Sequence, residues 1–272
     1  MAKLSILGAG GWALGLAILL NNNGHDVTVW SKVKAELDGI REEGENKKSL
    51  PGVKIPKEIK LCEDLKTVVA DADIVVMAVA SPFVRSTAKE VASLGINDIK
   101  MVNVAKGIEE DSLMTMTAII REEIPDVRIA ILSGPSHAEE VSRGIPTTCV
   151  IGADSKEYAE YLQNIFMSEV FRVYISPDVL GIELGGSLKN VIALAAGIAD
   201  GLGYGDNTKA ALITRGIHEI ARLGVAMGGK LQTFYGLSGM GDLIVTCASM
   251  HSRNRRAGIL LGKGEPLEKV LA

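Results

Sequence analysis

A cationic cluster lies near the C-terminal end of the sequence, at Ser252–Arg256, where three arginines, a serine and an asparagine occupy five consecutive positions. The whole chain has a formal net charge of −4, so the charge of this cluster is opposite in sign to that of the chain. Guanidinium groups bind phosphate and carboxylate oxygens through paired hydrogen bonds. The cluster therefore indicates an anionic ligand, and a solvated run of surface charge is the simplest alternative. The acidity of the chain and the lack of interleaved aromatic residues argue against a nucleic-acid contact.

Two lysines are placed for acid–base chemistry. Lys106 follows the predicted strand Met101–Val104, at the end of a strand where open α/β sheets bind ligands. Lys189 lies among apolar and very small residues, with Gly185 and Gly186 just before it. Burial disfavours a charged lysine, which is how a lysine comes to exchange a proton near neutral pH. The simpler interpretations are a surface position for Lys106 and, for Lys189, a buried stem with its ammonium group in water.

A dinucleotide fingerprint opens the chain. Gly8–Ala13 reads G-x-G-x-x-A and stands between the apolar run Leu4–Leu7 and a helical pattern. Gly8 allows the tight turn, Gly10 lets the backbone approach a pyrophosphate, and the small Ala13 keeps the helix close to the sheet. The N-terminus of the helix then offers N–H groups to the phosphates. The alternative is a glycine-rich turn without a ligand, which the strand–turn–helix context makes the weaker interpretation.

The second predicted strand ends without an acid. A carboxylate at this point binds the ribose 2′-hydroxyl of NAD, whereas Trp30–Lys32 supplies a hydroxyl and an ammonium group. Both groups would tolerate a 2′-phosphate. The pattern favours NADP and leaves NAD open.

The elements that must position these residues follow two patterns. Apolar strand-like runs alternate with helical stretches up to Pro177, which predicts an α/β fold with a Rossmann-like, doubly wound sheet. The expected strands are Leu4–Leu7, Val27–Trp30, Ile74–Val79, Met101–Val104, Ile129–Leu132, Thr147–Ile151 and Val170–Ile175, with helices at Gly11–Asn22 and Lys156–Phe166. After Pro177 only helices are expected, at Asp178–Ala199, Thr208–Met227 and Arg253–Leu261, with a glycine-rich turn region before the last. We therefore expect a dinucleotide-binding domain over residues 1–177 and an all-helical substrate-binding domain over residues 178–272, the first helix of the latter capped by Ser176.

Composition narrows the class of protein. The chain of 272 residues is 47% hydrophobic and 23% charged, which is typical of a globular protein with a substantial core. Its three cysteines show neither metal-ligand nor disulfide spacing, so we expect a reducing cytoplasm and no metal site. The first residues lack a signal-peptide pattern. The most apolar long stretch, Leu188–Ala199, contains Lys189 and Asn190, so membrane insertion is not expected.

Together these segments resemble the bacterial-type NAD(P)-dependent glycerol-3-phosphate dehydrogenases. The blocks that carry the resemblance are Gly8–Ala13, Asn46–Gly52, Lys106–Glu109, Leu132–Glu139, Glu183–Gly197, Gly236–Asp242 and Ser252–Gly258. Their order and spacing span almost the whole chain. The resemblance implies reversible reduction of dihydroxyacetone phosphate to sn-glycerol 3-phosphate for glycerophospholipid synthesis, in the cytoplasm, with NADP or NAD as cofactor.

The resemblance also implies roles for individual residues. Lys189 matches the proton donor and acceptor, and Lys106 matches a second catalytic lysine near cofactor and substrate. The positions matching cofactor contacts are Gly8, Gly10, Gly11, Trp12, Lys32, Lys106, Ala138 and Arg253. Those matching substrate contacts are Lys106, Gly134, Ser136, Lys189, Asp242, Ser252, Arg253 and Asn254. A homodimer is compatible with the resemblance.

Three departures from the family pattern stand out. Lys32 replaces an arginine found in many relatives, and Ala13 replaces the more usual glycine. Relatives continue for several helices beyond the point matching Ala272, so the helical domain is expected to be a truncated form. Two other functions fit the two-domain plan: a 3-hydroxyacid or ketopantoate-like reductase, and a non-catalytic dinucleotide-binding sensor.

Overall fold

The computed structural model describes residues 1–271, so Ala272, the last residue of the expected helical domain, lies outside the described residues. The chain divides into two compact units. The first unit comprises Met1–Leu132 and Ser136–Pro177. The second comprises Ser133–Pro135 and the residues from Asp178 onward. The two are described in turn.

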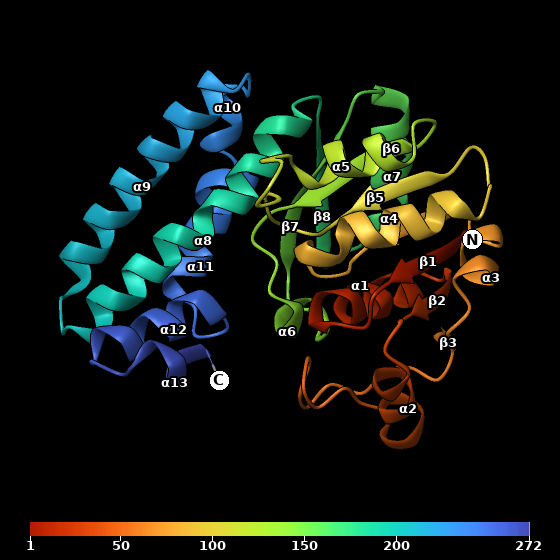
Figure 1. The fold of residues 1–272 in the computed structure, drawn as a ribbon, viewed down its shortest axis with the longest axis horizontal. Helices are drawn as coiled ribbons and strands as arrows, with labels where there is room; N and C mark the ends of the chain where they lie inside the picture. Colours follow the sequence, from red (N-terminus) through yellow and green to blue (C-terminus); the bar gives the residue numbers. More distant parts are fainter. Residues whose placement is uncertain (272) are drawn as a thin grey trace. The chain divides into compact units, whose positions relative to one another are not determined.

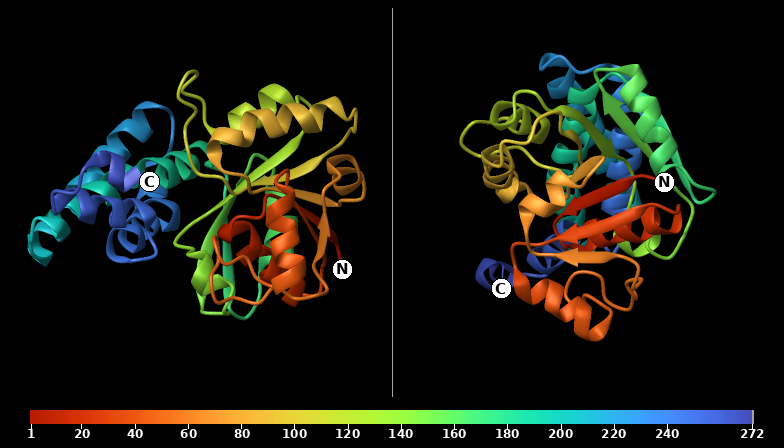
Figure 2. Two further views of the ribbon diagram at one scale, coloured as in Figure 1. Left: turned by 60° about the horizontal axis from the view of Figure 1, so that its bottom comes forward. Right: turned by 90° about the vertical axis from the view of Figure 1, so that its right-hand side faces the viewer.

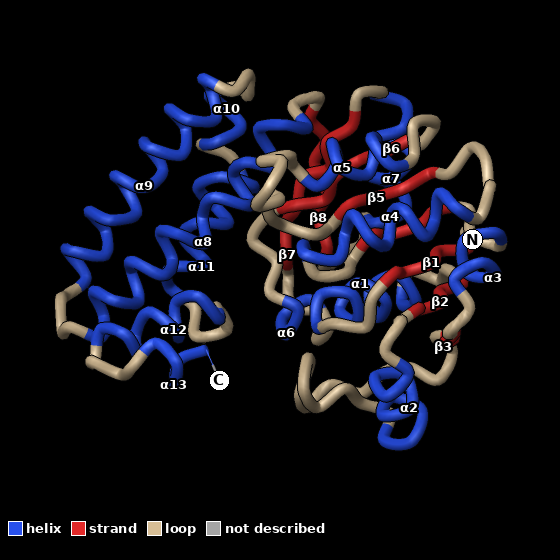
Figure 3. Tube along the Cα trace, in the orientation of Figure 1, coloured by secondary structure: helices blue, strands red, loops and turns tan. Residues whose placement is uncertain are grey.

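One eight-stranded sheet forms the centre of the first unit (Figures 1 and 3). Its strands are β1 (Lys3–Leu7), β2 (Asp26–Trp30), β3 (Lys60–Cys62), β4 (Ile74–Met77), β5 (Lys100–Asn103), β6 (Arg128–Ser133), β7 (Thr147–Ala153) and β8 (Phe171–Ser176). Their order across the sheet is β3-β2-β1-β4-β5-β6-β7-β8. Strands β1 to β6 pair in parallel, and β7 pairs in parallel with β8. The expected doubly wound, mainly parallel sheet is confirmed.

Two features of this topology bear on the site. The strand order reverses between β1 and β4, and ligands of open α/β sheets bind at the carboxyl ends of strands beside such a reversal. Asp154, just after β7, lines the same hollow as Lys100 and Arg128, the first residues of β5 and β6. Strand β7 therefore runs opposite to β6, so the last two strands are antiparallel to the rest.

Helices cover both faces of the sheet. They are α1 (Gly11–Asn22), α2 (Lys34–Glu43), α3 (Leu65–Ala70), the 3₁₀ turn η1 (Ser81–Phe83), α4 (Val84–Ser93), α5 (Met116–Glu123), α6 (Ala138–Val141) and α7 (Lys156–Phe166). Side chains alternate along β4: Ile74 and Val76 join a core with α1, α2 and α7, whereas Val75 and Met77 join a core with α3, α4 and α5. Burial on both faces explains why β4 reads as an unbroken apolar run.

From Asp178 onward, every regular element in the part of the second unit that the structure describes is a helix or a helical turn (Figure 2). Its elements are α8 (Val179–Gly201), α9 (Asp206–Ala226), α10 (Leu231–Phe234), the π-helical turn η2 (Leu237–Gly241), α11 (Asp242–Ala248), α12 (Arg253–Gly262) and α13 (Leu267–Leu271). Helix α8 is long and apolar enough to cross a membrane by length and composition, but half of its apolar window is buried inside the structure. It packs against α9, α11 and α12, as a core helix does.

Two details of the sequence prediction were wrong. The glycine-rich region before Arg253 is not a plain turn but holds α10, η2 and α11. The cap of α8 is Asp178 rather than Ser176, and the helix begins at Val179. The carboxylate of Asp178 accepts hydrogen bonds from the backbone N–H groups of Gly181 and Lys230, so contacts with a distant segment decide the cap.

Candidate active site

The glycine loop after β1 is shaped for close approach by a ligand. Gly8 has φ +124°, and a Cβ atom there would lie 2.9 Å from the carbonyl oxygen of Ala78. Gly10 caps α1 without a side chain, and a Cβ at Gly10 would meet no described atom within 4 Å. Space is therefore open beside Gly10 at the N-terminus of α1, where the helix dipole favours a phosphate.

Two observations show that this loop suits a dinucleotide. The buried indole Nε1 of Trp12 has no hydrogen-bond partner among the described residues. Ala138 lies against the start of α1, because Cβ atoms at Gly11 and Gly15 would stand 3.7 and 3.6 Å from its own Cβ. The predicted cofactor positions Gly8, Gly10, Gly11, Trp12 and Ala138 are thus gathered around one helix terminus of the first unit.

Asn46 holds the glycine loop, and the sequence prediction gave it no role. Its amide nitrogen donates to the carbonyl oxygen of Ala9 at 3.0 Å, and its amide oxygen accepts from the N–H of Ser49 at 3.0 Å. The side chain is buried, so both bonds are shielded from water. The signal was present in the block Asn46–Gly52, but its partner could not be identified from a separation of 37 residues.

Two carboxylates contact the residues that follow β2, although the sequence has no acidic residue directly at the end of that strand. The hydroxyl of Ser31 donates to the Glu36 carboxylate at 2.7 Å. The ammonium group of Lys32, which is largely exposed, forms an ion pair with Glu90. The groups expected to receive a 2′-phosphate therefore already have acidic partners, and the argument for NADP from the missing acid is weakened.

Lys106 follows β5 on a segment fixed by its own neighbours. The Asn103 side chain donates to the carbonyl oxygen of Ala105 and accepts from its N–H, both at 3.0 Å. A Cβ atom at Gly107 would lie 2.7 Å from the Cβ of Ser81, so a glycine suits this close contact. Lys106 is half-buried. It follows the carboxyl end of β5, and β4 separates β5 from β1, the strand that precedes the glycine loop.

Lys189 is buried in the second unit, on α8, with 7% of its surface exposed. Its ammonium group donates to the Asp242 carboxylate and, at 2.9 Å, to the hydroxyl of Thr246. Both partners lie on α11, one turn apart. A carboxylate this close favours the ammonium form and so opposes the effect of burial. The turn η2 approaches α8 closely at Gly185, since a Cβ there would stand 2.7 Å from the Ser238 carbonyl oxygen.

The cationic cluster forms the first turns of α12. Ser252 is the N-cap, and its hydroxyl oxygen accepts from the N–H of Arg255 at 3.2 Å. Arg253 is exposed and Asn254 is half-buried. Arg255 points elsewhere, since its guanidinium bonds to Asp200 on α8 at 2.6 and 3.0 Å. The cluster is therefore divided, because Arg253 and Arg256 are exposed whereas Arg255 is held against α8.

Gly134 and Ser136, predicted to contact the substrate, follow β6. Gly134 has φ +145°, which favours glycine over residues with a side chain. It belongs to the second unit by its contacts, whereas Ser136 belongs to the first. In the second unit, Pro135 lies 3.6 Å from the position of a Cβ atom at Gly241 in η2.

Comparison with known proteins places the chain in a family. The N-terminal and C-terminal sequence models of NAD-dependent glycerol-3-phosphate dehydrogenase match residues 3–159 and 178–272. A glycerol-3-phosphate dehydrogenase [NAD(P)+] of Fusobacterium nucleatum is 60% identical over all of this chain and 82% of its own length. The chain belongs to the NAD-dependent glycerol-3-phosphate dehydrogenase family. A second relative of the same name, from Agathobacter rectalis, is 55% identical over 99% of this chain and 80% of its own length.

Solved structures of glycerol-3-phosphate dehydrogenases share the fold. The Coxiella burnetii enzyme matches with a TM-score of 0.95 and 35% identity, over 99% of this chain and 83% of its own. The predicted class, an oxidoreductase that uses NAD or NADP, is confirmed by membership of this dehydrogenase family. The roles of the individual residues stay predictions.

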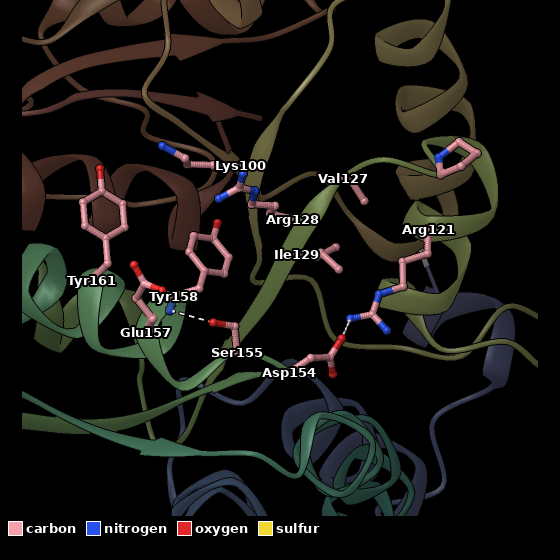
Figure 4. Close-up of a pocket in the computed structure, with 11 residues that line it drawn as sticks. Lys100, Arg121, Val127, Arg128, Ile129, Asp154, Ser155, Glu157, Tyr158 and Tyr161 are labelled. Carbon is pink, nitrogen blue, oxygen red and sulfur yellow. Dashed lines mark hydrogen bonds and ion pairs between the residues drawn. The ribbon is translucent and has the colours of Figure 1, made fainter.

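A hollow of the first unit lies at the opposite edge of the sheet from Gly8 and Lys106. It measures about 620 Å³ and opens at the start of β5 and β6, with Lys100, Arg128, Tyr158 and Tyr161 among its walls (Figure 4). Gly8 and Lys106 follow the opposite ends of their strands. This hollow is therefore separate from the predicted dinucleotide site.

Proposed function

We propose that the chain catalyses the reversible reduction of dihydroxyacetone phosphate to sn-glycerol 3-phosphate, with Lys189 as proton donor and acceptor. The observation that carries this proposal is the buried ammonium group of Lys189, held by Asp242 and Thr246. The same helical unit carries the cationic start of α12. A proton source and an anion-binding group in one unit suit a phosphorylated ketone.

The first unit is assigned to the dinucleotide. The open N-terminus of α1 would bind the pyrophosphate, with Gly8, Gly10, Gly11, Trp12 and Ala138 around it. Lys32 would lie toward the adenosine end, and Arg253 of the second unit would add a further cofactor contact. When bound, the reduced nicotinamide supplies the hydride that reduces the ketone carbon.

The lysines handle charge and the proton. Lys189 would stabilise the negative charge that develops on the carbonyl oxygen and then transfer a proton from Nζ to it. In the oxidation of glycerol 3-phosphate it would accept the hydroxyl proton instead. Asp242 and Thr246 would aim the ammonium group in both directions. Lys106 would contribute a second positive charge.

The start of α12 is assigned to the phosphate. Arg253 offers a guanidinium fork, Asn254 an amide, and Ser252 a hydroxyl hydrogen that remains available after its oxygen caps the helix. Gly134 and Ser136 are the remaining proposed substrate contacts.

The setting we propose is a cytoplasmic enzyme of lipid metabolism that forms a homodimer and neither enters a membrane nor binds nucleic acid. The net charge of −4 supports the absence of nucleic-acid binding, and the packing of α8 as a core helix supports the absence of membrane insertion.

Turnover and binding of purified variants test the function. The unaltered chain should oxidise glycerol 3-phosphate with NAD or NADP, and Lys189→Met should abolish turnover while the dissociation constant of the cofactor changes less than about twofold. Arg253→Gln should raise KM for dihydroxyacetone phosphate by tenfold or more, a loss of about 1.4 kcal/mol, whereas Arg256→Gln should not. Turnover of a 3-hydroxyacid without turnover of dihydroxyacetone phosphate would contradict the proposal, and so would an active Lys189→Met variant.

A further inference from the structure

Helices α8 and α12 cross backbone to backbone. Four glycines, two on each helix and four residues apart, form the crossing: Gly197, Gly201, Gly258 and Gly262. A Cβ atom at any of them would lie 2.1 to 2.3 Å from a backbone carbonyl oxygen of the other helix. Small residues at such spacing let helices approach closely, and a close backbone contact cannot yield as a flexible side chain can. The separation of the two helices is therefore fixed at this point.

Ion pairs among Arg255, Asp200 and Lys209 hold the rotation of α12 at the same crossing. Arg255 donates from Nε and Nη2 to one carboxylate oxygen of Asp200, at 3.0 and 2.6 Å. The other oxygen of Asp200 lies 2.9 Å from the ammonium group of Lys209 on α9. Burial by itself would raise the pKa of Asp200, but the hydrogen bonds from Lys209 and Arg255 outweigh it and hold the pKa below its ordinary value. The side chains of Arg255 and Asp200 are 11% and 16% exposed, so this ion pair is largely shielded from water.

The two helices that cross each carry a residue of the proposed chemistry, the proton donor Lys189 on α8 and the phosphate-binding Arg253 on α12. Lys189 precedes Gly197 on α8 by eight residues, or about 12 Å of helix. Arg253 precedes Gly258 on α12 by five residues, or about 8 Å. A rotation or slide of α12 at the crossing would move Arg253 and Asn254 relative to Lys189, because each sits on a stiff helix that meets the other there.

We propose that Arg255, through its bonds to Asp200, is a positioning residue that sets where the first turn of α12 meets the phosphate of the substrate. This inference rests on the proposed function, in which Arg253 and Asn254 bind that phosphate. Arg255 itself makes no substrate contact in this scheme. A displacement of about 1 Å at a binding group is enough to cost on the order of a hundredfold in rate.

Binding and turnover of five variants test the inference, three of them at positions 255 and 256. Arg255→Ala should weaken calorimetric binding of glycerol 3-phosphate about tenfold and raise KM for dihydroxyacetone phosphate similarly. Its kcat/KM for dihydroxyacetone, which lacks the phosphate, should stay within about twofold. Arg255→Lys, which keeps the charge, should recover part of the loss and also provides a second variant if the alanine form does not fold. Arg256→Ala, at the exposed next position, is the matched control and should behave as the unaltered chain.

Asp200→Ala separates positioning from charge. If Arg255 only lent a positive field, removing the nearby negative charge would strengthen binding of the anion. A positioning role predicts the opposite, weaker binding, as in Arg255→Ala. Asp206→Ala, an exposed acid on α9 near the same Lys209, is the control for loss of a negative charge.

Equal losses on both substrates, or tighter binding by Asp200→Ala, would overturn the inference, as would an unaltered chain that does not bind glycerol 3-phosphate. Binding without turnover in the unaltered chain would instead refute the proposed function and leave the positioning role measurable by calorimetry.

Discussion

Removing one partner of the ion pair between Lys189 and Asp242 should cause a large and measurable loss of stability in the helical unit. Both residues are almost fully buried, at 7% and 1% exposure. Removing one partner of a buried pair leaves the other charge without compensation and typically costs about 3–5 kcal/mol. At about 4 Å between charge centres and an effective dielectric constant near 20, the attraction is also about 4 kcal/mol. Asp242→Asn should therefore destabilise the unit by about 3 kcal/mol.

A double-mutant cycle isolates the pair. In a Lys189→Met background the ammonium group is gone, so Asp242→Asn should cost far less, and the coupling energy should be about 2–4 kcal/mol. Urea denaturation followed by far-UV circular dichroism reports the helices of both units, so a loss of ellipticity that fluorescence does not follow belongs to the helical unit. Tryptophan fluorescence reports the first unit, because both tryptophans, Trp12 and Trp30, lie there. The fluorescence transition thus checks that the first unit is unaffected.

An exposed ion pair of the same unit is the control. Lys269 and Glu265 stand one turn apart at 2.7 Å and are 70% and 35% exposed. Pairs of this kind contribute about 0.3–0.5 kcal/mol. If the buried pair showed a coupling no larger than this, the electrostatic reasoning for Lys189 would be refuted.

Two further predictions concern thiol reactivity and cofactor choice. Burial raises the pKa of Cys247 to about 11, so only about one thiolate in a thousand exists at pH 8, and a thiol reagent should modify the partly exposed Cys62 first. Cys247 should react only after unfolding or as the pH rises toward 11; fast labelling at pH 8 in the folded chain would contradict this. Glu90→Gln should release Lys32 from an exposed pair worth about 0.2–1 kcal/mol and so raise affinity for NADP relative to NAD up to about fivefold. Calorimetric titration with each dinucleotide measures the ratio, and an unchanged ratio would mean that Lys32 does not reach the 2′-phosphate.

Local patterns were sufficient for most of the first unit. The helix over Gly11–Asn22 and the helix over Lys156–Phe166 have the bounds predicted from spacing alone. The buried strand β4 was recognisable because both of its faces are apolar. The short β3, with three residues at the edge of the sheet, has no such signal. It forms because β2 offers it a parallel partner, which is a tertiary condition.

The sequence by itself determined that the chain has a Rossmann-type glycine loop, an unusual lysine at position 189 and a cationic segment late in the chain, because each depends on neighbouring residues. Only the tertiary structure decided which groups these residues meet. Asp242 lies 53 positions from Lys189, and Asp200 lies 55 from Arg255. The physical reason is that a charge can be buried only beside a partner, and the partner is chosen by which helix faces fold together. The four glycines of the α8–α12 crossing make that choice for Arg255, by bringing two backbones into contact.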